Sequence, residues 1–224
     1  MGKLTLTYWE LRGLCMPIQW IMEYAGVDHN INRMTSPEQW QAEKPKLPLD
    51  FPNLPHIVDG NVRMSESFAI CKYLAKKHGL MPKSDQEIIN SDIAEGAVND
   101  FRMMLFQLMG NPNYATEKAD YPAKLKVKLA LFEKVFAKRS WLAGGSLTWL
   151  DFVLYESLDT NAMFVPGILD DFPNVLAYKK KIDNLGKIAA YRKSNRFSDW
   201  PITGGGSPWG APGSQPGTTI HSKL

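Results

Sequence analysis

The stretch LTLTYWELRGL, residues 4–14, carries the strongest structural signal in the chain. Its first four residues alternate between apolar and polar side chains, which is the period of a half-buried β-strand. Tyr8 stands at the end of this strand, just before a turn that contains Gly13. A second stretch, DFPNLPHIV at residues 50–58, places Pro55 at the entry to another predicted strand. The two stretches predict a site built from a phenol at one strand end and a proline before another strand.

Residues 1–82 predict a small α/β domain. A helical spacing of apolar residues begins near Pro17, a residue favoured in the first turn of a helix, and stops at Gly26. Asp59-Gly60 separates two short strand-like runs and predicts a two-residue hairpin turn. The expected elements are strands at 3–8, 29–34, 56–58 and 61–64, helices at 17–25 and 67–78, and a loop over 35–55. This order, βαβ followed by ββα, is that of a thioredoxin-like domain.

The rest of the chain shows no convincing strand. Thr148 and Asp151 have the spacing of a capping box, placed before a helix that we expect in the core of a second domain. Helical patterns are expected at 86–110, 121–138, 148–163, 173–184 and 187–195. We therefore expect an all-helical domain over residues 83–202. Residues 203–224 are rich in Gly, Pro and Ser, which predicts a mobile C-terminal tail.

The composition is that of an ordinary globular protein. The chain has 224 residues, of which 44% are hydrophobic, enough to bury a core. Its formal net charge of +3 is too small to indicate a nucleic acid or an acidic membrane as a partner. Cys15 and Cys71 have neither a metal-binding nor a CxxC spacing, so we expect no metal site and a reducing compartment. We recognise no signal peptide and no membrane-spanning run, and expect a cytoplasmic protein.

The two stretches resemble those of cytosolic glutathione transferases, and most closely the mu class and its flatworm relatives. The run from Tyr8 to Leu14 has the mu-class form with minor changes, and residues 49–55 match in the same order. The resemblance extends from residue 3 to about residue 201. It implies a thioredoxin-like α/β domain followed by an all-α domain, in a homodimeric transferase that serves detoxification. The glutathione thiolate would attack a hydrophobic electrophile, with glutathione as co-substrate and no cofactor.

Tyr8 is the catalytic residue that this resemblance implies. A free thiol has a pKa of about 8.5, so little of it is thiolate at neutral pH. A hydroxyl that donates a hydrogen bond to the sulfur favours the anion, and the anion can attack an electrophile. Tyr8 would act as a donor rather than as a base, because an unperturbed phenol keeps its proton at neutral pH.

The resemblance also implies a set of glutathione-binding residues. Glu66-Ser67 precedes a predicted helix, whose N-terminal amides can bind the carboxylate at the γ-glutamyl end of the ligand. Glu66 stands where the mu class normally has glutamine, and its carboxylate can pair with the ligand's α-ammonium. The bond before Pro55 is cis in this fold, which turns the backbone of Leu54 toward the ligand. The full expected set is Trp9, Leu14, Trp40, Lys44, Asn53, Leu54, Pro55, Glu66, Ser67 and, reaching across a dimer interface, Asp100.

The pocket for the electrophile departs more from the family pattern. Gly110 stands where many mu enzymes carry a tyrosine, and Thr203-Gly204 replaces an aromatic–polar pair. Leu11 and Phe106 remain as expected apolar residues of this pocket. We therefore expect a hydrophobic substrate pocket of Leu11, Phe106, Gly110 and Thr203 that is more open and less polar than usual.

Three residues are expected at a dimer interface. Phe51 matches an aromatic residue that the mu class inserts into its partner subunit. Lys72 and Lys76 lie four residues apart, on one face of a predicted helix, and match basic residues near the two-fold axis.

Two other functions remain open at the level of sequence. A protein of this fold can bind hydrophobic ligands or serve a structural role without turnover, and the altered Gly110 and Thr203 leave room for this. Cys15, near the start of the first predicted helix, could instead be the nucleophile of a thiol transferase. It has no partner cysteine and no proline directly after it, so an inert buried thiol is the favoured interpretation.

Overall fold

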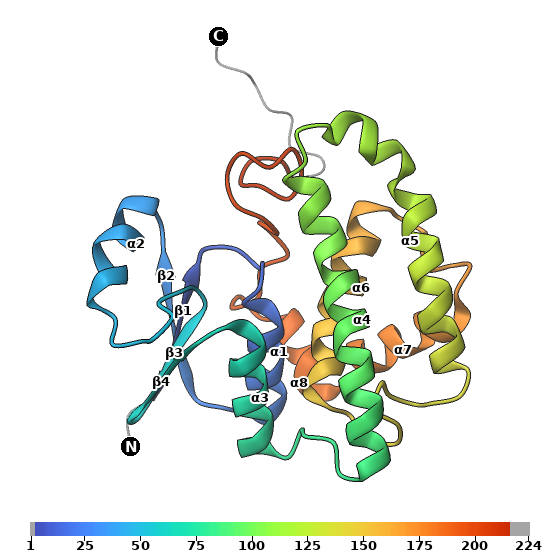
Figure 1. Ribbon diagram of the computed structural model, residues 1–224, viewed down its shortest axis with the longest axis horizontal. Helices are drawn as coiled ribbons and strands as arrows, with labels where there is room; N and C mark the ends of the chain where they lie inside the picture. The colour runs from blue at the N-terminus through green and yellow to red at the C-terminus, as the bar shows by residue number, and fades with distance from the viewer. Residues whose placement is uncertain (1–2, 216–224) are drawn as a thin grey trace. The chain divides into compact units, whose positions relative to one another are not determined.

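A computed structural model describes residues 3–215, which form two compact units (Figure 1). The first unit contains the chain up to His78 together with the residues from Tyr191 onward, and the second contains Gly79–Ala190. This division differs from the sequence prediction, which assigned residues 191–202 to the helical domain. It arises because the segment after Tyr191 packs against the first helix of the chain.

The first unit has a four-stranded sheet at its centre. Its elements are β1 (Leu4–Trp9), α1 (Met16–Ala25), β2 (His29–Met34), α2 (Pro37–Glu43), β3 (His56–Asp59), β4 (Val62–Ser65) and α3 (Ser67–His78). The strand order is β2-β1-β3-β4, with β1 parallel to β2 and antiparallel to β3, and with β3 antiparallel to β4. Helices α1 and α3 lie side by side on one face of the sheet and α2 lies on the other (Figure 1). The predicted thioredoxin-like order is confirmed.

Glycines end two of these elements as the sequence predicted. Gly26 follows α1 in the left-handed region, at φ 73°, where a residue without Cβ meets no steric penalty. Gly60 has φ 60° in the hairpin turn, and Asp59 pairs with Val62 across it.

The predicted loop over residues 35–55 is partly wrong, since it contains α2 and a short 3-10 helix at Lys44–Lys46. Helix α2 begins with a side-chain cap, because Ser36 Oγ accepts a hydrogen bond of 3.2 Å from the backbone N–H of Gln39. Pro37 occupies the first turn, where its missing N–H is not needed. Trp40 is buried, and its packing holds this short helix against the unit.

Helix α1 is buried on more than its sheet-facing side. Trp20, which is fully buried, contacts the rings of Tyr191 and Phe197 at centroid distances of 5.4 and 5.2 Å. The backbone N–H groups of Arg12 and Gly13 donate to the carbonyls of residues 201 and 202, at 2.8 and 3.0 Å. The segment after Tyr191 is therefore part of the core around α1.

Residues 203–215, the first part of the expected tail, form a loop with several hydrogen bonds to the preceding residues. The carbonyl of Gly210 accepts hydrogen bonds from the N–H groups of Ile202 and Thr203, at 2.7 and 2.9 Å. The indole N–H of Trp200 donates to the carbonyl of Ala211 at 2.8 Å, and Trp209 packs edge-on against that indole. These hydrogen bonds fix a segment that has little apolar surface of its own. Residues 216–224 of the expected tail lie outside the described residues.

The second unit is all-helical. Its helices are α4 (Asp85–Met109), α5 (Tyr114–Phe136), α6 (Trp149–Phe164), α7 (Pro173–Asp183) and the start of α8 (Gly186–Arg192). Helix α6 is buried from Trp149 to Asn161 and forms the centre of the unit. The predicted capping box at its start is confirmed, because the Asp151 carboxylate accepts from the N–H of Thr148 at 2.7 Å. None of the helices in the described part of the chain is both long and apolar enough to span a membrane.

Helix α5 begins seven residues earlier than the sequence predicted, at Tyr114 rather than residue 121, so that Pro122 lies inside it. A proline in a helix interior removes one backbone hydrogen bond. Packing offsets this cost, since the buried Tyr121 donates its hydroxyl to Asn161 at 2.7 Å and stacks edge-on against Phe164.

Candidate functional site

Tyr8 lies at the end of β1 with 6% of its surface exposed. Its hydroxyl oxygen accepts a hydrogen bond of 3.0 Å from the backbone N–H of Leu14. This contact fixes the position of the oxygen at the turn between β1 and α1. A phenol oxygen that accepts a hydrogen bond still has its own proton, which it can donate to another group.

The same turn requires a glycine. Gly13 has φ 42°, a conformation that side chains rarely adopt. A Cβ added at this position would lie 2.6 Å from the Tyr8 hydroxyl oxygen and 2.5 Å from Cδ1 of Leu11. Gly13 therefore allows the phenol to approach the turn closely, and it sets the position of the candidate donor. The sequence analysis placed Gly13 in the turn but gave it no role in the site.

A polar cluster lies where the chain enters β3 and leaves β4. The side chain of Asn53 donates to the carboxylate of Glu66 at 3.2 Å and accepts from the backbone N–H of Leu54 at 2.9 Å. The Leu54–Pro55 peptide bond is cis, the isomer that the resemblance implied. The structure thus brings Asn53, Leu54, Pro55 and Glu66 together.

Glu66 is the one described non-glycine residue with a positive φ, at 72°. Such backbone conformations are strained for L-residues and concentrate at functional sites. The carbonyl of Glu66 accepts from the N–H of Ile70 at 2.9 Å, and the buried Ser67 opens α3. The amides of this first turn carry the positive end of the helix dipole and can bind a carboxylate.

The remaining expected glutathione residues of the first unit lie on α2, just after it, and at the β1–α1 turn. Trp40 is buried on α2, and the Lys44 ammonium, just after that helix, lies 5.9 Å from the centre of its indole ring. Trp9 and Leu14, which flank the β1–α1 turn, are half-buried.

Three expected residues lie in the second unit, on α4 or at its end. Asp100 is exposed, and its carboxylate lies 3.8 Å from the Lys128 ammonium. Phe106 is half-buried, and Gly110 caps the helix and is exposed.

The two other residues expected in the electrophile pocket belong to the first unit. The side chain of Leu11 packs over Gly13, and its Cδ2 would lie 4.0 Å from a Cβ added at Gly204. Thr203 is 6% exposed, and its hydroxyl donates to the carbonyl of Trp209 at 3.0 Å. The Thr203 hydroxyl is therefore engaged in a hydrogen bond within the C-terminal loop.

Cys15 is fully buried at the start of α1. Its Sγ accepts a hydrogen bond of 3.3 Å from the side-chain N–H of Gln19. Reactive thiols need access to their partner, so the burial agrees with an inert side chain. Among residues 3–215, no group of three or more His, Cys, Asp or Glu side chains could hold a metal ion.

One polar atom near the cluster was not foreseen. His56, directly after Pro55, is 6% exposed, and its Nε2 has no hydrogen-bond partner in the described structure. Burial lowers the pKa of His56, against the attraction of the Glu43 carboxylate. Burial therefore favours the neutral form of this imidazole, a feature that its place in an apolar strand could have suggested.

Comparison with known proteins finds relatives over nearly the whole chain. Family models described as "Glutathione S-transferase, N-terminal domain" and "Glutathione S-transferase, C-terminal domain" match residues 4–76 and 99–195. Glutathione S-transferase Mu 1 of Mus musculus is 40% identical over 204 residues, which are 88% of this chain and 94% of the mouse protein. The Mu 1 protein of Oryctolagus cuniculus is 38% identical over 206 residues, 89% of this chain and 94% of the rabbit protein.

Solved structures share the fold. The glutathione S-transferase Blo t 8 has a TM-score of 0.87 at 29% identity and matches 92% of this chain and 99% of its own. The Pi-class glutathione S-transferase of Onchocerca volvulus has a TM-score of 0.81 at 26% identity. The match covers 92% of this chain and 100% of the Onchocerca chain. A thioredoxin-like domain followed by a helical domain is common to all three.

Proposed function

The chain belongs to the glutathione S-transferase family, and we propose that Tyr8 is the group with which it activates the glutathione thiol. The family conjugates glutathione to electrophiles, and the relatives identified above are Mu enzymes. The observation that supports the role of Tyr8 is its fixed hydroxyl, which accepts the Leu14 amide at 3.0 Å beside a turn that only glycine fits.

In this mechanism the Tyr8 hydroxyl donates a hydrogen bond to the sulfur of bound glutathione. The bond stabilises the thiolate relative to the thiol, so the thiol proton leaves to solvent and the pKa of the thiol falls. The sulfur lone pair then forms a C–S bond with the electrophilic carbon. In a substitution the bonding pair departs with the leaving group, and in an addition the π pair moves onto the attached electron-withdrawing group and takes a proton from solvent. The Leu14 amide holds the phenol oxygen in place, so that little reorganisation is needed.

Binding of glutathione would use both charged ends of the tripeptide. The amides at Ser67 and the first turn of α3 would bind the γ-glutamyl carboxylate, and the Glu66 carboxylate would pair with the α-ammonium. Lys44 and the indole N–H of Trp40 would meet the glycyl carboxylate. The backbone of Leu54 would pair with the cysteinyl backbone, beside Asn53 and between Trp9 and Leu14. These roles are supported by the cluster around Glu66 and by the buried position of Trp40.

The second substrate would be a hydrophobic electrophile bound near Leu11, Phe106, Gly110 and Thr203. Leu11 supports this role, because its side chain lies against the turn that positions the Tyr8 hydroxyl. Thr203 would contribute through its methyl group, since its hydroxyl is engaged by Trp209. We place the activity in the cytoplasm, in detoxification, with glutathione as co-substrate and no cofactor.

The active species would be a homodimer. Helices α4 and α5 form an apolar groove of about 220 Å³, which includes Ile93 and Leu131, 73% and 53% exposed. On the first unit Phe51 is 77% exposed, an unusual position for a ring of that size. Exposed apolar surface of this kind marks an interaction site, and Phe51 of one copy would fill the groove of the other. Asp100, exposed on the same helix as the groove, would then reach the neighbour's glutathione site. Lys72 and Lys76 are exposed on α3 and would lie near the two-fold axis.

The test is glutathione conjugation of a generic aryl halide by the wild type and by Tyr8→Phe. Loss of one charge-assisted hydrogen bond, about 1.5–3 kcal/mol, should lower turnover roughly ten- to a hundredfold. Ultraviolet titration of the bound thiolate should show a raised thiol pKa, with glutathione affinity unchanged. Tyr73→Phe is the matched control, since its hydroxyl donates to Asp59 at the hairpin, and it should turn over normally. Equal activity in Tyr8→Phe would remove Tyr8 from the mechanism, and inactivity of Cys15→Ser would favour thiol transfer instead.

A further inference from the structure

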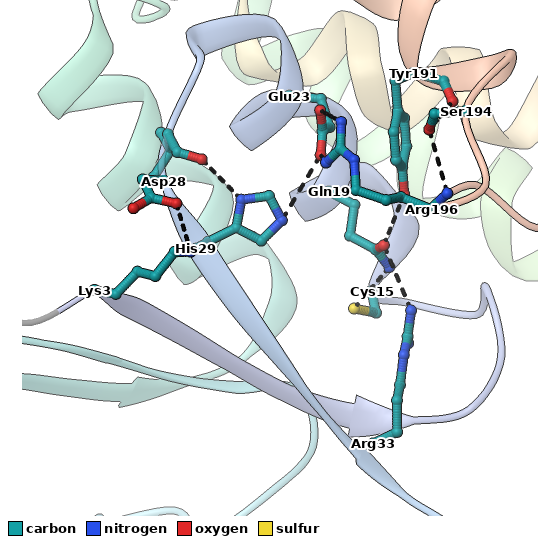
Figure 2. A network of polar contacts seen from close by, with 11 residues as sticks. Lys3, Cys15, Gln19, Glu23, Asp28, His29, Arg33, Tyr191, Ser194 and Arg196 are labelled. Carbon is teal, nitrogen blue, oxygen red and sulfur yellow. Dashed lines mark hydrogen bonds and ion pairs between the residues drawn. The ribbon is translucent and has the colours of Figure 1, made fainter.

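The side chain of Gln19 joins three segments of the first unit next to the β1–α1 turn. Gln19 lies on α1 and is 1% exposed. Its carbonyl oxygen accepts hydrogen bonds from the Tyr191 hydroxyl of α8 at 3.0 Å and from the Arg33 guanidinium of β2 at 3.5 Å. Its amide nitrogen donates to Cys15 Sγ, at the start of α1, at 3.3 Å. Figure 2 shows these three side chains meeting at Gln19.

A glutamine suits this position because its neighbours require opposite groups. A guanidinium has donors only, so an oxygen must face Arg33. The Tyr191 hydroxyl donates to the same oxygen, and burial raises the pKa of Tyr191 to about 12, so this hydroxyl keeps its proton at neutral pH. The amide nitrogen is then left to face Cys15 Sγ, which is a weak acceptor. A glutamate would offer no donor to the sulfur, and a methionine would offer neither group.

Arg33 extends these contacts to the end of β1. Besides its bond to Gln19, its guanidinium donates to the backbone carbonyl of Trp9 at 3.0 Å. That carbonyl also accepts the N–H of Leu11, at 2.8 Å, where the turn begins. Trp9 directly follows Tyr8, and Tyr8 is the partner of Arg33 in the register of β1 and β2. Arg33 therefore holds the backbone at the point where the chain leaves Tyr8.

Cys15 lies at the other end of the same turn. It directly follows Leu14, whose N–H donates to the Tyr8 hydroxyl at 3.0 Å. The N–H of Cys15 donates to the carbonyl of Arg12 at 3.1 Å, and its fully buried thiol accepts the Gln19 amide. Gln19 thus contacts the residue after Leu14 directly and, through Arg33, the residue after Tyr8.

From these contacts we propose that Gln19 is a positioning residue for the Tyr8 hydroxyl. Its side chain keeps the two ends of the β1–α1 turn at a fixed separation, and Arg33 is the link to one of them. This role rests on the proposed donor function of Tyr8 and extends it. The hydroxyl has to point at the glutathione sulfur with little reorganisation, and a hydrogen bond weakens steeply when its angle departs from linear. A turn that is free to relax would therefore stabilise the thiolate less.

The test measures turnover of an aryl halide, and the thiol pKa of bound glutathione by ultraviolet titration, in Gln19→Met. Methionine keeps the length of the side chain and removes the three hydrogen bonds. Turnover at neutral pH should fall roughly tenfold and the thiol pKa should rise by roughly one unit, with glutathione affinity within about twofold of wild type. The deficit in turnover should shrink as the pH rises above the thiol pKa of the variant, because both proteins then hold glutathione as the thiolate.

Tyr121→Phe is the matched control for a general loss of stability. Tyr121 in the second unit is also buried, and its hydroxyl donates to a side-chain amide, that of Asn161, at 2.7 Å. This variant should melt at a lower temperature and keep the wild-type turnover and thiol pKa. If it moved the thiol pKa as far as Gln19→Met does, loss of stability would be the cause and the proposal would be overturned. Arg33→Met guards against misfolding of Gln19→Met, since Arg33 is only half-buried, and it should change turnover and the thiol pKa in the same direction.

Combination with Tyr8→Phe shows whether Gln19 acts through the phenol. Without the hydroxyl, Gln19→Met should change neither turnover nor the thiol pKa further. A further tenfold loss in the Tyr8→Phe background would overturn the positioning role, and so would wild-type turnover and thiol pKa in folded Gln19→Met and Arg33→Met. In both cases a loss of activity in Tyr8→Phe alone would still support the donor function. Wild-type activity in Tyr8→Phe would overturn both proposals.

Discussion

Two candidate residues of the first unit, Tyr8 and Glu66, take part in side-chain hydrogen bonds, whereas the contact described for Asp100 in the second unit is an ion pair. The Tyr8 oxygen is fixed by the Leu14 amide, and Glu66 is fixed by Asn53. Asp100 in the second unit is exposed, with one loose ion pair to Lys128. A residue fixed by close contacts is displaced when a single atom is added next to it. An exposed residue can contribute to the site only when a partner subunit covers it. The difference predicts which substitutions abolish turnover and which act through assembly.

The largest effect is expected from Gly13→Ala. The added Cβ would lie 2.6 Å from the Tyr8 hydroxyl oxygen, so the phenol must move. A displacement of about 1 Å at a catalytic group can cost roughly a hundredfold in rate, and we expect that loss in turnover of an aryl halide. The left-handed φ of 42° adds about 1–2 kcal/mol of strain.

Gly60→Ala separates these two causes. Gly60 also has a positive φ, of 60°, but a Cβ added there meets no atom within 4 Å. This variant should lose about 1 kcal/mol of unfolding free energy in a denaturant titration and keep wild-type turnover. If Gly60→Ala lost as much activity as Gly13→Ala, strain rather than the phenol contact would be responsible.

Phe51→Ala tests the part of the comparison that depends on a partner. Burying a phenylalanine contributes about 1.5–3 kcal/mol, so the variant should weaken a dimer roughly ten- to a hundredfold. Sedimentation over a concentration series measures this directly. Val62→Ala, at a less exposed apolar position on the first unit, should leave assembly unchanged. A wild-type chain that sediments as a monomer at micromolar concentration would contradict the dimer, and with it the role of Asp100.

Truncation after Trp209 should have a smaller effect, on stability alone. It removes the carbonyls of Gly210 and Ala211, which accept three hydrogen bonds from residues 200–203. We expect a loss of about 1–3 kcal/mol and a melting temperature lower by several degrees. Glutathione affinity should not change. A chain ending at Gln215 is the control and should melt as the full chain does, while loss of affinity in either truncation would show that the tail covers the site.

Local patterns in the sequence predicted most of the first unit and the start of α6 in the second. The alternation before Tyr8, the Asp59-Gly60 turn and the Thr148 capping box each depend on residues within a few positions, and all three are confirmed. Helix α2 was missed because the prolines spread over residues 35–55 suggested a loop. The signal that could have revealed it is Ser36 followed by Pro37, a cap and a first-turn proline.

The C-terminal segment could not be placed from local patterns. Its contacts with the rest of the unit join residues far apart in sequence, such as Gln19 and Tyr191, which are separated by 172 positions. A stretch rich in Gly, Pro and Ser predicts mobility when it is read alone. The hollow lined by both Arg33 and Trp200 escaped prediction for the same reason, since Arg33 lies on β2 and Trp200 near the C-terminus. The expected roles of the site residues, by contrast, came from the family resemblance and stay predictions until tested.

The smallest effect is expected at Glu66, and it concerns one charge. Glu66→Gln keeps the oxygen that accepts from Asn53 at 3.2 Å, so the cluster should stay intact. What it removes is the negative charge proposed to pair with the α-ammonium of glutathione, and an exposed ion pair contributes only about 0.2–1 kcal/mol. Calorimetric affinity for glutathione should therefore fall by roughly two- to fivefold. An analogue of glutathione that lacks the α-amino group provides the control, because wild type and Glu66→Gln should bind it equally. If the variant lost affinity for both ligands alike, Glu66 would act by holding Asn53 and Leu54 in place rather than by recognising the ammonium.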